Sequence, residues 1–311
     1  CLSKNIYCRK ADSRFRRRLS LKKGNPMLNL FGEFGGNELH SAPREPIWPD
    51  ARVQWTAVIP FHNEAAYLPA CLHSLARQTV RVRLVLVDNG STDGSAEVAR
   101  RTCIELGLDA VHVHEEVPGK VAALQCGLRE VGSEFVATCD ADTIYPPHYL
   151  QTAGNLLAGR HVVAAVAATC APGSSRRKAL IAGLRMRLTA ALLPQQCLNG
   201  GAGQVFRTSA LRGCGGFDPA IWNWVLEDHE IMARIECLGR IAYGHTFFCH
   251  PTERPRSTDC RGWNLGEQLR YHATTDGERQ AFFHEFLGPR LRQRALPSEM
   301  LRRYEGLPAS A

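Results

Sequence analysis

From residue 53 onward, segments typical of buried strands alternate with segments of helical spacing, and this alternation constrains the fold more than any other feature. Trp55-Thr-Ala-Val-Ile59 is a short apolar run, and we expect Pro60 to end the strand that it forms. Further strands are expected at 82–87, 111–114, 134–139 and 162–168, and helices at 64–77, 95–106, 119–130, 147–158, 176–193 and 227–237. Strands that alternate with helices predict an α/β fold, a mostly parallel sheet with helices on both faces.

Polar side chains gather where these strands end. The clusters are Pro60 to Glu64, Asp88 to Asp93, and Asp140 to Asp142. Ligands of parallel sheets bind outside the carboxyl ends of the strands. The sequence therefore predicts that these three clusters meet at one binding site.

The pair Asp140-Ala-Asp142 directly follows the predicted strand 134–139. Two carboxylates so close to a buried strand are desolvated and repel each other, and a bound cation relieves both costs. Oxygen ligands favour Mg²⁺ or Mn²⁺, which also bind diphosphate oxygens. The alternative is a surface turn in which both side chains cap the next segment.

The net charge of +8 is concentrated near the start of the chain. We interpret residues 1–50 as a basic N-terminal extension that is either a solvated tail or an element attracted to an anionic membrane surface. Neither aromatic interleaving nor a known motif supports nucleic-acid binding. No apolar run reaches the length of a membrane-spanning helix, and no secretory signal is recognisable. Peripheral association with the inner membrane face remains compatible with this charge.

The chain has 12 cysteines, and none forms a Cys-x-x-Cys pair. Because most lie in apolar segments, we expect reduced, buried thiols and a cytoplasmic protein without a zinc site. Examples are Cys71, Cys103, Cys126, Cys139 and Cys237.

Several motifs in order carry a resemblance to a known family. They are Val58-Ile-Pro-Phe-His-Asn-Glu64, Val87-Asp-Asn-Gly-Ser-Thr-Asp-Gly94, Cys139-Asp-Ala-Asp142, Gly215-Gly-Phe-Asp218 and Glu227-Asp-His-Glu230. Over about residues 54–250 the chain resembles family 2 glycosyltransferases, which have the GT-A fold. The resemblance implies an enzyme of the hexosyltransferase class, which moves a sugar from a nucleotide-diphosphate donor, most often a UDP-sugar, to an acceptor with inversion.

The resemblance also implies roles for single residues. Pro60 and Glu64 would line the nucleotide pocket, and Asp88 would accept hydrogen bonds from the base. Asp140 and Asp142 occupy the place of the family's DxD motif, which holds the metal and the diphosphate, with Asp142 as the direct ligand of Mn²⁺ or Mg²⁺.

The remaining site residues follow from the same comparison. Asp228 matches the catalytic base and Glu227 would orient the base or the acceptor, although an acidic first helical turn is the simpler alternative. Lys120 opens a helix whose amides suit a diphosphate, unless it is merely an exposed cation. His250 is a candidate third metal ligand and His245 its competitor, with a histidine that binds no metal as the alternative.

The chain also departs from the family. The nearest match to the processive synthases' Gln- or Arg-x-x-Arg-Trp motif is Glu267-Gln-Leu-Arg270-Tyr271, which lacks the first residue and the Trp. We therefore expect transfer of a single sugar to a saccharide or lipid-linked acceptor, in polysaccharide or glycolipid synthesis of the cell envelope. Trp222 and Trp224 would either stack on the acceptor or pack in the core.

Two other functions stay open. A non-catalytic nucleotide-sugar-binding scaffold would keep the same pocket. A sugar nucleotidyltransferase would need a Gly-rich loop with Arg and Lys where this chain has Phe61 to Glu64. The predicted domains are the extension over 1–50, a GT-A glycosyltransferase domain over 51–260, and a helical C-terminal tail over 261–311.

Overall fold

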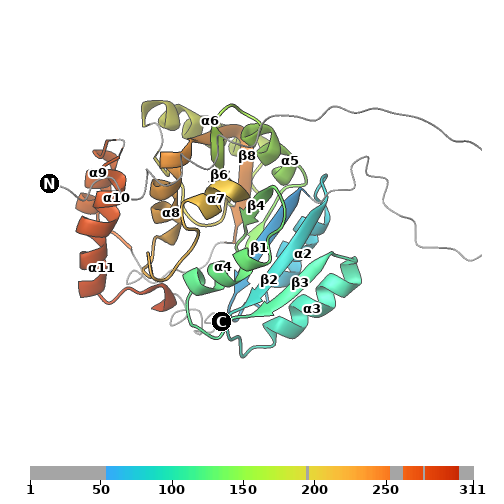
Figure 1. Cartoon of the computed structure of the whole chain (residues 1–311). Helices are drawn as coiled ribbons and strands as arrows, with labels where there is room; N and C mark the ends of the chain where they lie inside the picture. Colours follow the sequence, from blue (N-terminus) through green and yellow to red (C-terminus); the bar gives the residue numbers. More distant parts are fainter. Residues whose placement is uncertain (1–53, 194–195, 253–261, 276, 301–311) are drawn as a thin grey trace, which may run out of the picture. The chain divides into compact units, whose positions relative to one another are not determined.

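The computed structural model describes residues 54–193, 196–252, 262–275 and 277–300 (Figure 1). The predicted N-terminal extension over 1–50 lies outside the described residues. The chain from Val53 onward forms one compact unit.

One eight-stranded sheet organises this unit, in the order β3-β2-β1-β4-β7-β6-β8-β5. The strands are β1 (Trp55–Phe61), β2 (Val82–Asp88), β3 (Ala110–His114), β4 (Phe135–Thr138), β5 (Thr143–Ile144), β6 (Val162–Thr169), β7 (Gln204–Arg207) and β8 (Arg240–Pro251). β1 to β4 are mutually parallel, β7 runs antiparallel to β4 and β6, and β8 is parallel to β6. The mostly parallel sheet predicted from the sequence is confirmed.

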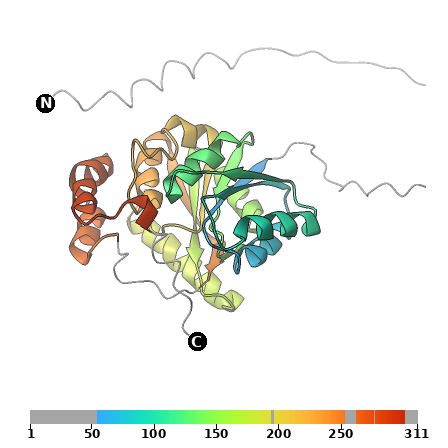
Figure 2. The same ribbon diagram turned by 90° about the horizontal axis from the view of Figure 1, so that it is seen from below.

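Helices cover both faces of the sheet (Figures 1 and 2). They are α2 (Leu68–Ala76), α3 (Ser95–Leu106), α4 (Lys120–Arg129), α5 (Tyr149–Leu157), α6 (Arg176–Leu192), α7 (Thr208–Gly213), α8 (Glu227–Ile235), α9 (Leu265–His272), α10 (Arg279–Ala281) and α11 (Gly288–Gln293). Shorter turns are the 3-10 helices Glu236–Leu238 and Ser298–Met300 and the π-helix Phe282–Leu287.

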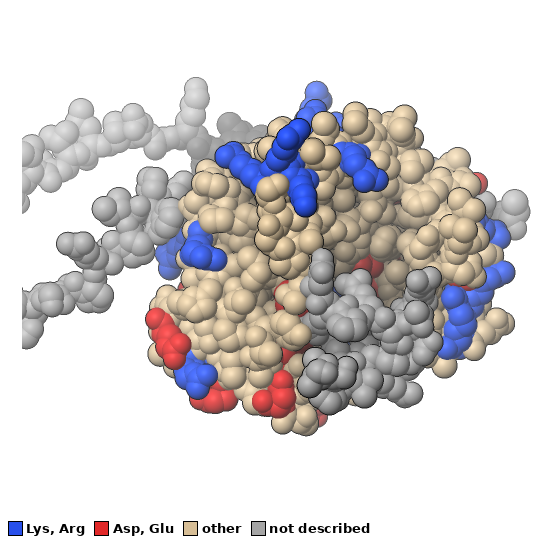
Figure 3. Space-filling view, turned by 180° about the vertical axis from the view of Figure 1, so that it is seen from behind, with Lys and Arg blue, Asp and Glu red and all other residues tan. Residues whose placement is uncertain are grey.

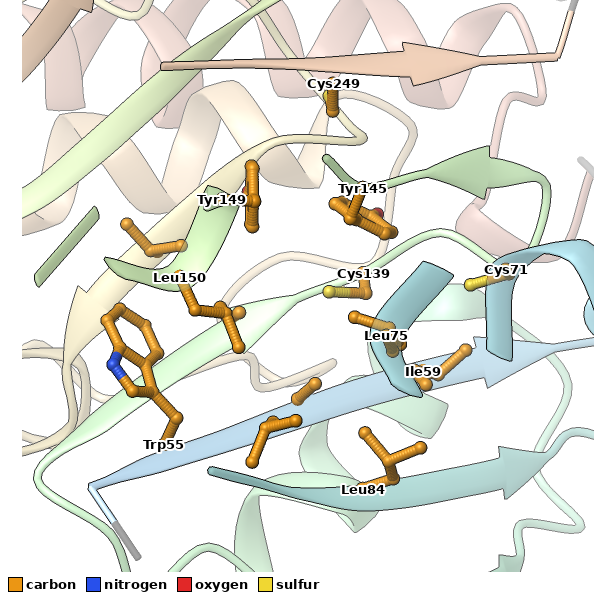
Figure 4. Packing of buried hydrophobic residues seen from close by; sticks show 14 of the residues in the cluster. Trp55, Ile59, Cys71, Leu75, Leu84, Cys139, Tyr145, Tyr149, Leu150 and Cys249 are labelled. Carbon is orange, nitrogen blue, oxygen red and sulfur yellow. The ribbon is translucent and has the colours of Figure 1, made fainter. Parts of the chain in front are cut away.

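Alternate residues of each strand enter two separate cores, because successive side chains of a strand point to opposite faces. Trp55 and Ile59 of β1 pack with α2, α3 and α5, and Figure 4 shows Leu75 and Leu150 of these helices against them. Val58 of the same strand packs on the other face with α4, α7 and α8. Both faces of the central strands are therefore buried, and the site forms where these strands end.

The expectation that Pro60 ends the first strand is wrong. β1 continues to Phe61, and Pro60 pairs with Val87 of β2. The Val58 carbonyl accepts from Cys139, which follows β4, and the Phe61 carbonyl accepts from Asn89, which follows β2. Because successive residues of a strand face opposite neighbours, the nitrogen of Pro60 faces the β4 side, as Val58 does. Pairing with β4 stops at Val58, so no partner there requires an N–H from Pro60.

The C-terminal helices pack on the segment that precedes α8. Trp222 is only 3% exposed and lies edge-on against Phe283, within a cluster that includes Tyr271 and Leu287. Core packing is therefore the role of Trp222, and stacking on an acceptor is not. No helix among the described residues is both long and apolar enough to cross a membrane.

One expectation about burial needs correction. Cys71, Cys103, Cys126 and Cys139 are buried, but Cys237 is exposed. All cysteines in the described ranges are free thiols.

Candidate functional site

The loops that follow β1 and β2 hold each other in place. The backbone N–H of Glu64 donates to Ser95 Oγ at 2.7 Å, and that of Ala65 donates to Asp93 Oδ2 at 3.0 Å. Burial would raise the pKa of Asp93, but the hydrogen bonds from Ser95 and Ala65 lower it below its usual value. Glu64 is itself 7% exposed. The two polar clusters thus form one preformed rim.

Asp88 lies at this rim, but its carboxylate already has partners. Oδ1 accepts from the backbone N–H of Ser91 at 2.9 Å, and Oδ2 lies 3.3 Å from His114 Nδ1. The sequence left Asp88 free to accept from a base. In the structure it also stabilises its own loop, which fixes the direction of its remaining lone pairs.

Asn89 is a structural residue of the rim that sequence reasoning missed. It is 3% exposed and donates to the carbonyls of Glu115 and Val117 at 2.9 and 2.8 Å, while its Oδ1 accepts from Gly119 N at 2.9 Å. It thereby links the end of β2 to the start of α4. The only sequence signal was its place within Asp-Asn-Gly, which reads as a turn.

The start of α4 differs from the predicted diphosphate site. The Gly119 amide donates to Asn89, and the Val121 amide donates to Ser298 Oγ at 3.1 Å. Two amides that we expected to bind phosphate therefore have partners within the protein. The charge of Lys120 remains the feature of this segment that suits an anion.

Lys120 links carboxylates from two distant segments. Its Nζ lies 2.8 Å from Asp140 Oδ1 and 3.4 Å from Glu227 Oε1. Burial would lower the pKa of Lys120, but Asp140 and Glu227 raise it well above its ordinary value. Lys120 is therefore a permanent cation at the centre of an acidic group.

The pKa values of the adjacent residues Glu227 and Asp228 are shifted in opposite directions. Burial and the neighbouring Asp228 charge raise the pKa of Glu227, against the influence of Lys120. Burial would also raise the pKa of Asp228, but His229 lowers it to about 2, since His229 Nδ1 and N both lie within 2.9 Å of Asp228 Oδ1. Asp228 is thus ionised, and His229 is a second residue that the sequence analysis missed.

The segment Asn199–Gly203 brings these carboxylates together. A Cβ on Gly200 would lie 2.2 Å from Asp228 Oδ2, and a Cβ on Gly201 would lie 3.5 Å from Asp140 Oδ2 and 3.7 Å from Asp228 Oδ2. Gln204, which follows, donates to the Asp228 carbonyl at 2.9 Å. The sequence analysis assigned this segment no role, although its glycines let the backbone approach both carboxylates.

Asp142 directly precedes strand β5, and His250 lies on the neighbouring strand β8. β5 begins one residue after Asp142 and pairs with β8, where His250 is opposite Ile144. His250 Nδ1 lies 3.2 Å from the Cys170 carbonyl, and His245 is exposed beside α6. Within the described ranges, no three His, Cys, Asp or Glu side chains are grouped as a ready metal cage.

The donor set nevertheless fits a hard divalent cation. Mg²⁺ typically takes one or two carboxylates and completes its shell with water and substrate phosphates. Asp140, Glu227 and Asp228 outnumber Lys120 at this place, so the centre carries an excess of negative charge. Such an excess favours a cation with an anionic substrate.

One small cavity joins most of the predicted site. Its lining includes Pro60, Lys120, Asp140, Gly201, Gln204, Glu227 and Asp228. Glu64, Asp88, Asp142 and His250 are not part of this lining. The structure therefore places the candidate base and the first Asp of the acidic motif on one cavity, and Pro60 of the rim lines the same cavity.

Solved structures with a similar fold are glycosyltransferases. The mannosyltransferase PcManGT from Pyrobaculum calidifontis, solved with GDP-Man and Mn²⁺, is 21% identical with a TM-score of 0.58, covering 79% of this chain and 74% of that one. TarS 1-349 from S. aureus, solved with UDP-GlcNAc, is 17% identical with a TM-score of 0.52, covering 76% and 72%. The GT-A fold predicted above is confirmed.

Curated relatives match over shorter stretches. The uncharacterized glycosyltransferase YaiP of Escherichia coli is 28% identical over 200 residues, 58% of this chain and 50% of that protein. Glycosyltransferase GlyA of Streptococcus pneumoniae is 31% identical over 98 residues, 31% of this chain and 14% of that protein. The chain thus spans half or less of the length of these relatives. The family model of glycosyl transferase family 2 matches residues 56–214, and the chain belongs to this family.

Proposed function

We propose that the protein is a metal-dependent, inverting glycosyltransferase that moves a single sugar from a nucleotide-diphosphate sugar to an acceptor. The observation that carries the proposal is the junction of Asp140, Lys120 and the Glu227-Asp228 pair on one cavity. Sugar transfer needs positive charge beside the donor diphosphate and a proton acceptor beside the acceptor hydroxyl. This junction offers both, because its carboxylates attract a cation and one of them, Asp228, is ionised and can accept a proton.

Asp228 is the proposed base. Inversion requires a group that accepts the proton of the acceptor hydroxyl as its oxygen attacks the anomeric carbon from the side opposite the leaving nucleotide. His229 keeps Asp228 ionised, and Gln204 holds its backbone. Glu227, with its raised pKa, is suited to orient the acceptor through a hydrogen bond.

Asp140 and Asp142 are the proposed holders of Mn²⁺ or Mg²⁺, with His250 as a candidate further ligand. When bound, such an ion neutralises charge on the departing diphosphate. Lys120 adds a fixed positive charge at the same place, and it would pair with phosphate oxygens once a cation compensates Asp140. The Mn²⁺ in PcManGT, which shares the fold, supports this choice of metal.

The proposed donor pocket is the rim of Pro60, Glu64 and Asp88. A UDP-sugar is the first donor to test and a GDP-sugar the second, because the two solved relatives hold UDP-GlcNAc and GDP-Man. The proposed acceptor is a saccharide or lipid-linked sugar of the cell envelope. We place the reaction in the cytoplasm, at the inner membrane face.

The test is donor hydrolysis across a panel of nucleotide sugars with Mn²⁺, with Mg²⁺ and with EDTA. We expect one donor to release its nucleoside diphosphate, only with metal, and Asp142→Ala to weaken metal-dependent donor binding. Asp109→Ala, on the surface beside Arg83, is the matched control. Binding of a nucleotide sugar without any release or transfer would instead identify the protein as a scaffold, and diphosphate release from a nucleoside triphosphate plus sugar phosphate would identify a nucleotidyltransferase.

A further inference from the structure

Helix α6 exposes a continuous apolar stripe. Ile181, Leu184, Leu188 and Leu192 are 52%, 50%, 59% and 82% exposed. Their spacings of three and four residues place them on one side of the helix. Four of the nine exposed large apolar side chains in the described residues thus lie along this single helix.

The stripe is flanked by positive charge. The sequence of α6 contains five basic residues and no Asp or Glu, namely Arg176, Arg177, Lys178, Arg185 and Arg187. All five are exposed. Figure 3 shows Lys and Arg side chains gathered at the top of the molecule, where α6 lies in Figure 1, without acidic side chains among them. Exposed apolar side chains with Lys and Arg beside them suit the boundary between lipid headgroups and acyl chains, although the side of α6 opposite the stripe packs on the sheet and is not a charged face.

The opposite side of α6 holds the helix firmly on the sheet. Ala179 and Gly183 are its buried residues, and a Cβ on Gly183 would lie 2.4 Å from the His245 carbonyl oxygen of β8. Small residues allow this close approach, and Leu180 and Met186 are half-buried. The apolar stripe formed by Ile181, Leu184, Leu188 and Leu192 stays exposed among the described residues.

We infer that α6 docks the protein on the surface of a membrane that contains anionic lipid. The apolar stripe enters the interface, while the basic flanks pair with lipid phosphates. The alternative occupant, a second copy of α6, would place ten cations against each other without one acid on either helix, so charge favours lipid over self-association. The chain that follows α6 leads to Gly201, which lines the proposed catalytic cavity.

The inference goes beyond the proposed reaction and does not depend on it. It uses only α6, and none of the residues that we assign to donor, metal or base. It also differs from docking through the basic residues 1–23, which lie outside the described residues.

Flotation of the full chain with phosphatidylcholine vesicles, with and without phosphatidylglycerol, tests the proposed docking of α6 on a membrane. We expect binding only with phosphatidylglycerol and weaker binding at high salt. Leu184→Gln/Leu188→Gln should lower the partition coefficient about tenfold or more. Arg185→Glu/Arg187→Glu should remove the preference for phosphatidylglycerol.

Matched controls lie on other helices. Leu265→Gln/Leu269→Gln changes two α9 leucines that are 71% and 62% exposed, and Arg100→Glu/Arg101→Glu changes two exposed cations on α3. Both controls should float like the unchanged protein, and every variant should keep donor hydrolysis in solution. Equal flotation of the α6 variants and the controls would overturn the inference. So would α6 variants that dissociate a dimer in sedimentation velocity but bind vesicles normally.

Discussion

The rim after β1 and β2 and the centre around Lys120 solve the problem of buried polar groups in different ways. In the rim, amides and side chains such as Asn89 satisfy one another through neutral or single-charge hydrogen bonds. In the centre, Lys120 pairs with Asp140 and Glu227, and the third carboxylate, Asp228, lies against His229. The rim is complete without a ligand, whereas the centre keeps an excess of negative charge that a bound cation would relieve.

Each of the two regions also contains a residue with left-handed backbone. In the rim it is Asn63, with φ of +55°, and asparagine tolerates this conformation better than most residues. Leu226, the residue before Glu227, has φ of +67°, a conformation that costs a non-glycine residue about 1–3 kcal/mol. Its side chain is held in the cluster around Trp222. The strain and the excess of negative charge beside Glu227 and Asp228 support the proposal that catalysis takes place there, and we propose that the rim supplies the rigid frame. Mutations should therefore affect activity at the centre and stability at the rim.

The largest effect on activity should come from Asp228→Asn. We expect transfer to fall on the order of a thousandfold, because the base is lost, while donor affinity stays nearly unchanged. Rates of transfer and calorimetric binding of the donor, measured on the same preparation, check this. Near-normal turnover would show that Asp228 is not the base.

Lys120→Met should have the next effect. We expect kcat/KM to fall about a hundredfold, because Asp140 and Glu227 lose their shared cation and the donor loses a positive partner. Lys178→Met, which removes an exposed cation on α6, is the matched control. If both variants retain full activity, the charge of Lys120 is merely structural.

The rim should respond differently. Asn89→Leu removes three hydrogen bonds to buried backbone groups and should lower the free energy of unfolding by about 2–3 kcal/mol. Glu227→Gln at the centre should change stability far less, because burial raises the pKa of Glu227 and its charged form therefore does not stabilise the fold. Urea unfolding of both variants measures the difference, and equal losses would break the proposed division between rim and centre.

The smallest effect should be a shift in pH dependence. His229→Asn removes the interaction that lowers the pKa of Asp228 to about 2, so this pKa should rise by roughly one unit. A base works only above its pKa, and the acidic limb of the kcat/KM profile should therefore move to higher pH. An unmoved limb, with activity otherwise intact, would separate His229 from the titration of Asp228.

Local patterns in the sequence were enough to predict five of the eight strands and the position of the sheet's polar edge, but they did not predict β5, β7 and β8. The alternation from Trp55 to Cys139 fixed the parallel order of strands and helices, and the motifs placed Asp140 and Asp228 at one site. Contacts between residues far apart in the sequence could not be predicted from local patterns. Ser298 bonds to Val121 across 177 positions, and no pattern near either residue indicates it.

The misses at Asn89 and Gly200 have a related cause. Each looked like a turn or break residue, which is what its local conformation requires. Its importance comes from tertiary neighbours, the carbonyls of Glu115 and Val117 for Asn89 and the Asp228 carboxylate for Gly200. For Pro60 the error was the opposite one, because a break was predicted where none occurs. The strand continues through this proline because β4 no longer pairs with β1 at that point and no hydrogen bond from its nitrogen is needed.

The central claim is that the acidic centre binds a divalent cation together with a nucleoside diphosphate. Calorimetric titration of UDP and of GDP into the full chain, with Mn²⁺ and with EDTA, tests this most directly, with Asp140→Asn as the comparison. We predict that one diphosphate binds only with Mn²⁺ and that Asp140→Asn removes most of this affinity. Equal affinity in Mn²⁺ and EDTA, or an unchanged affinity of Asp140→Asn, would contradict the claim.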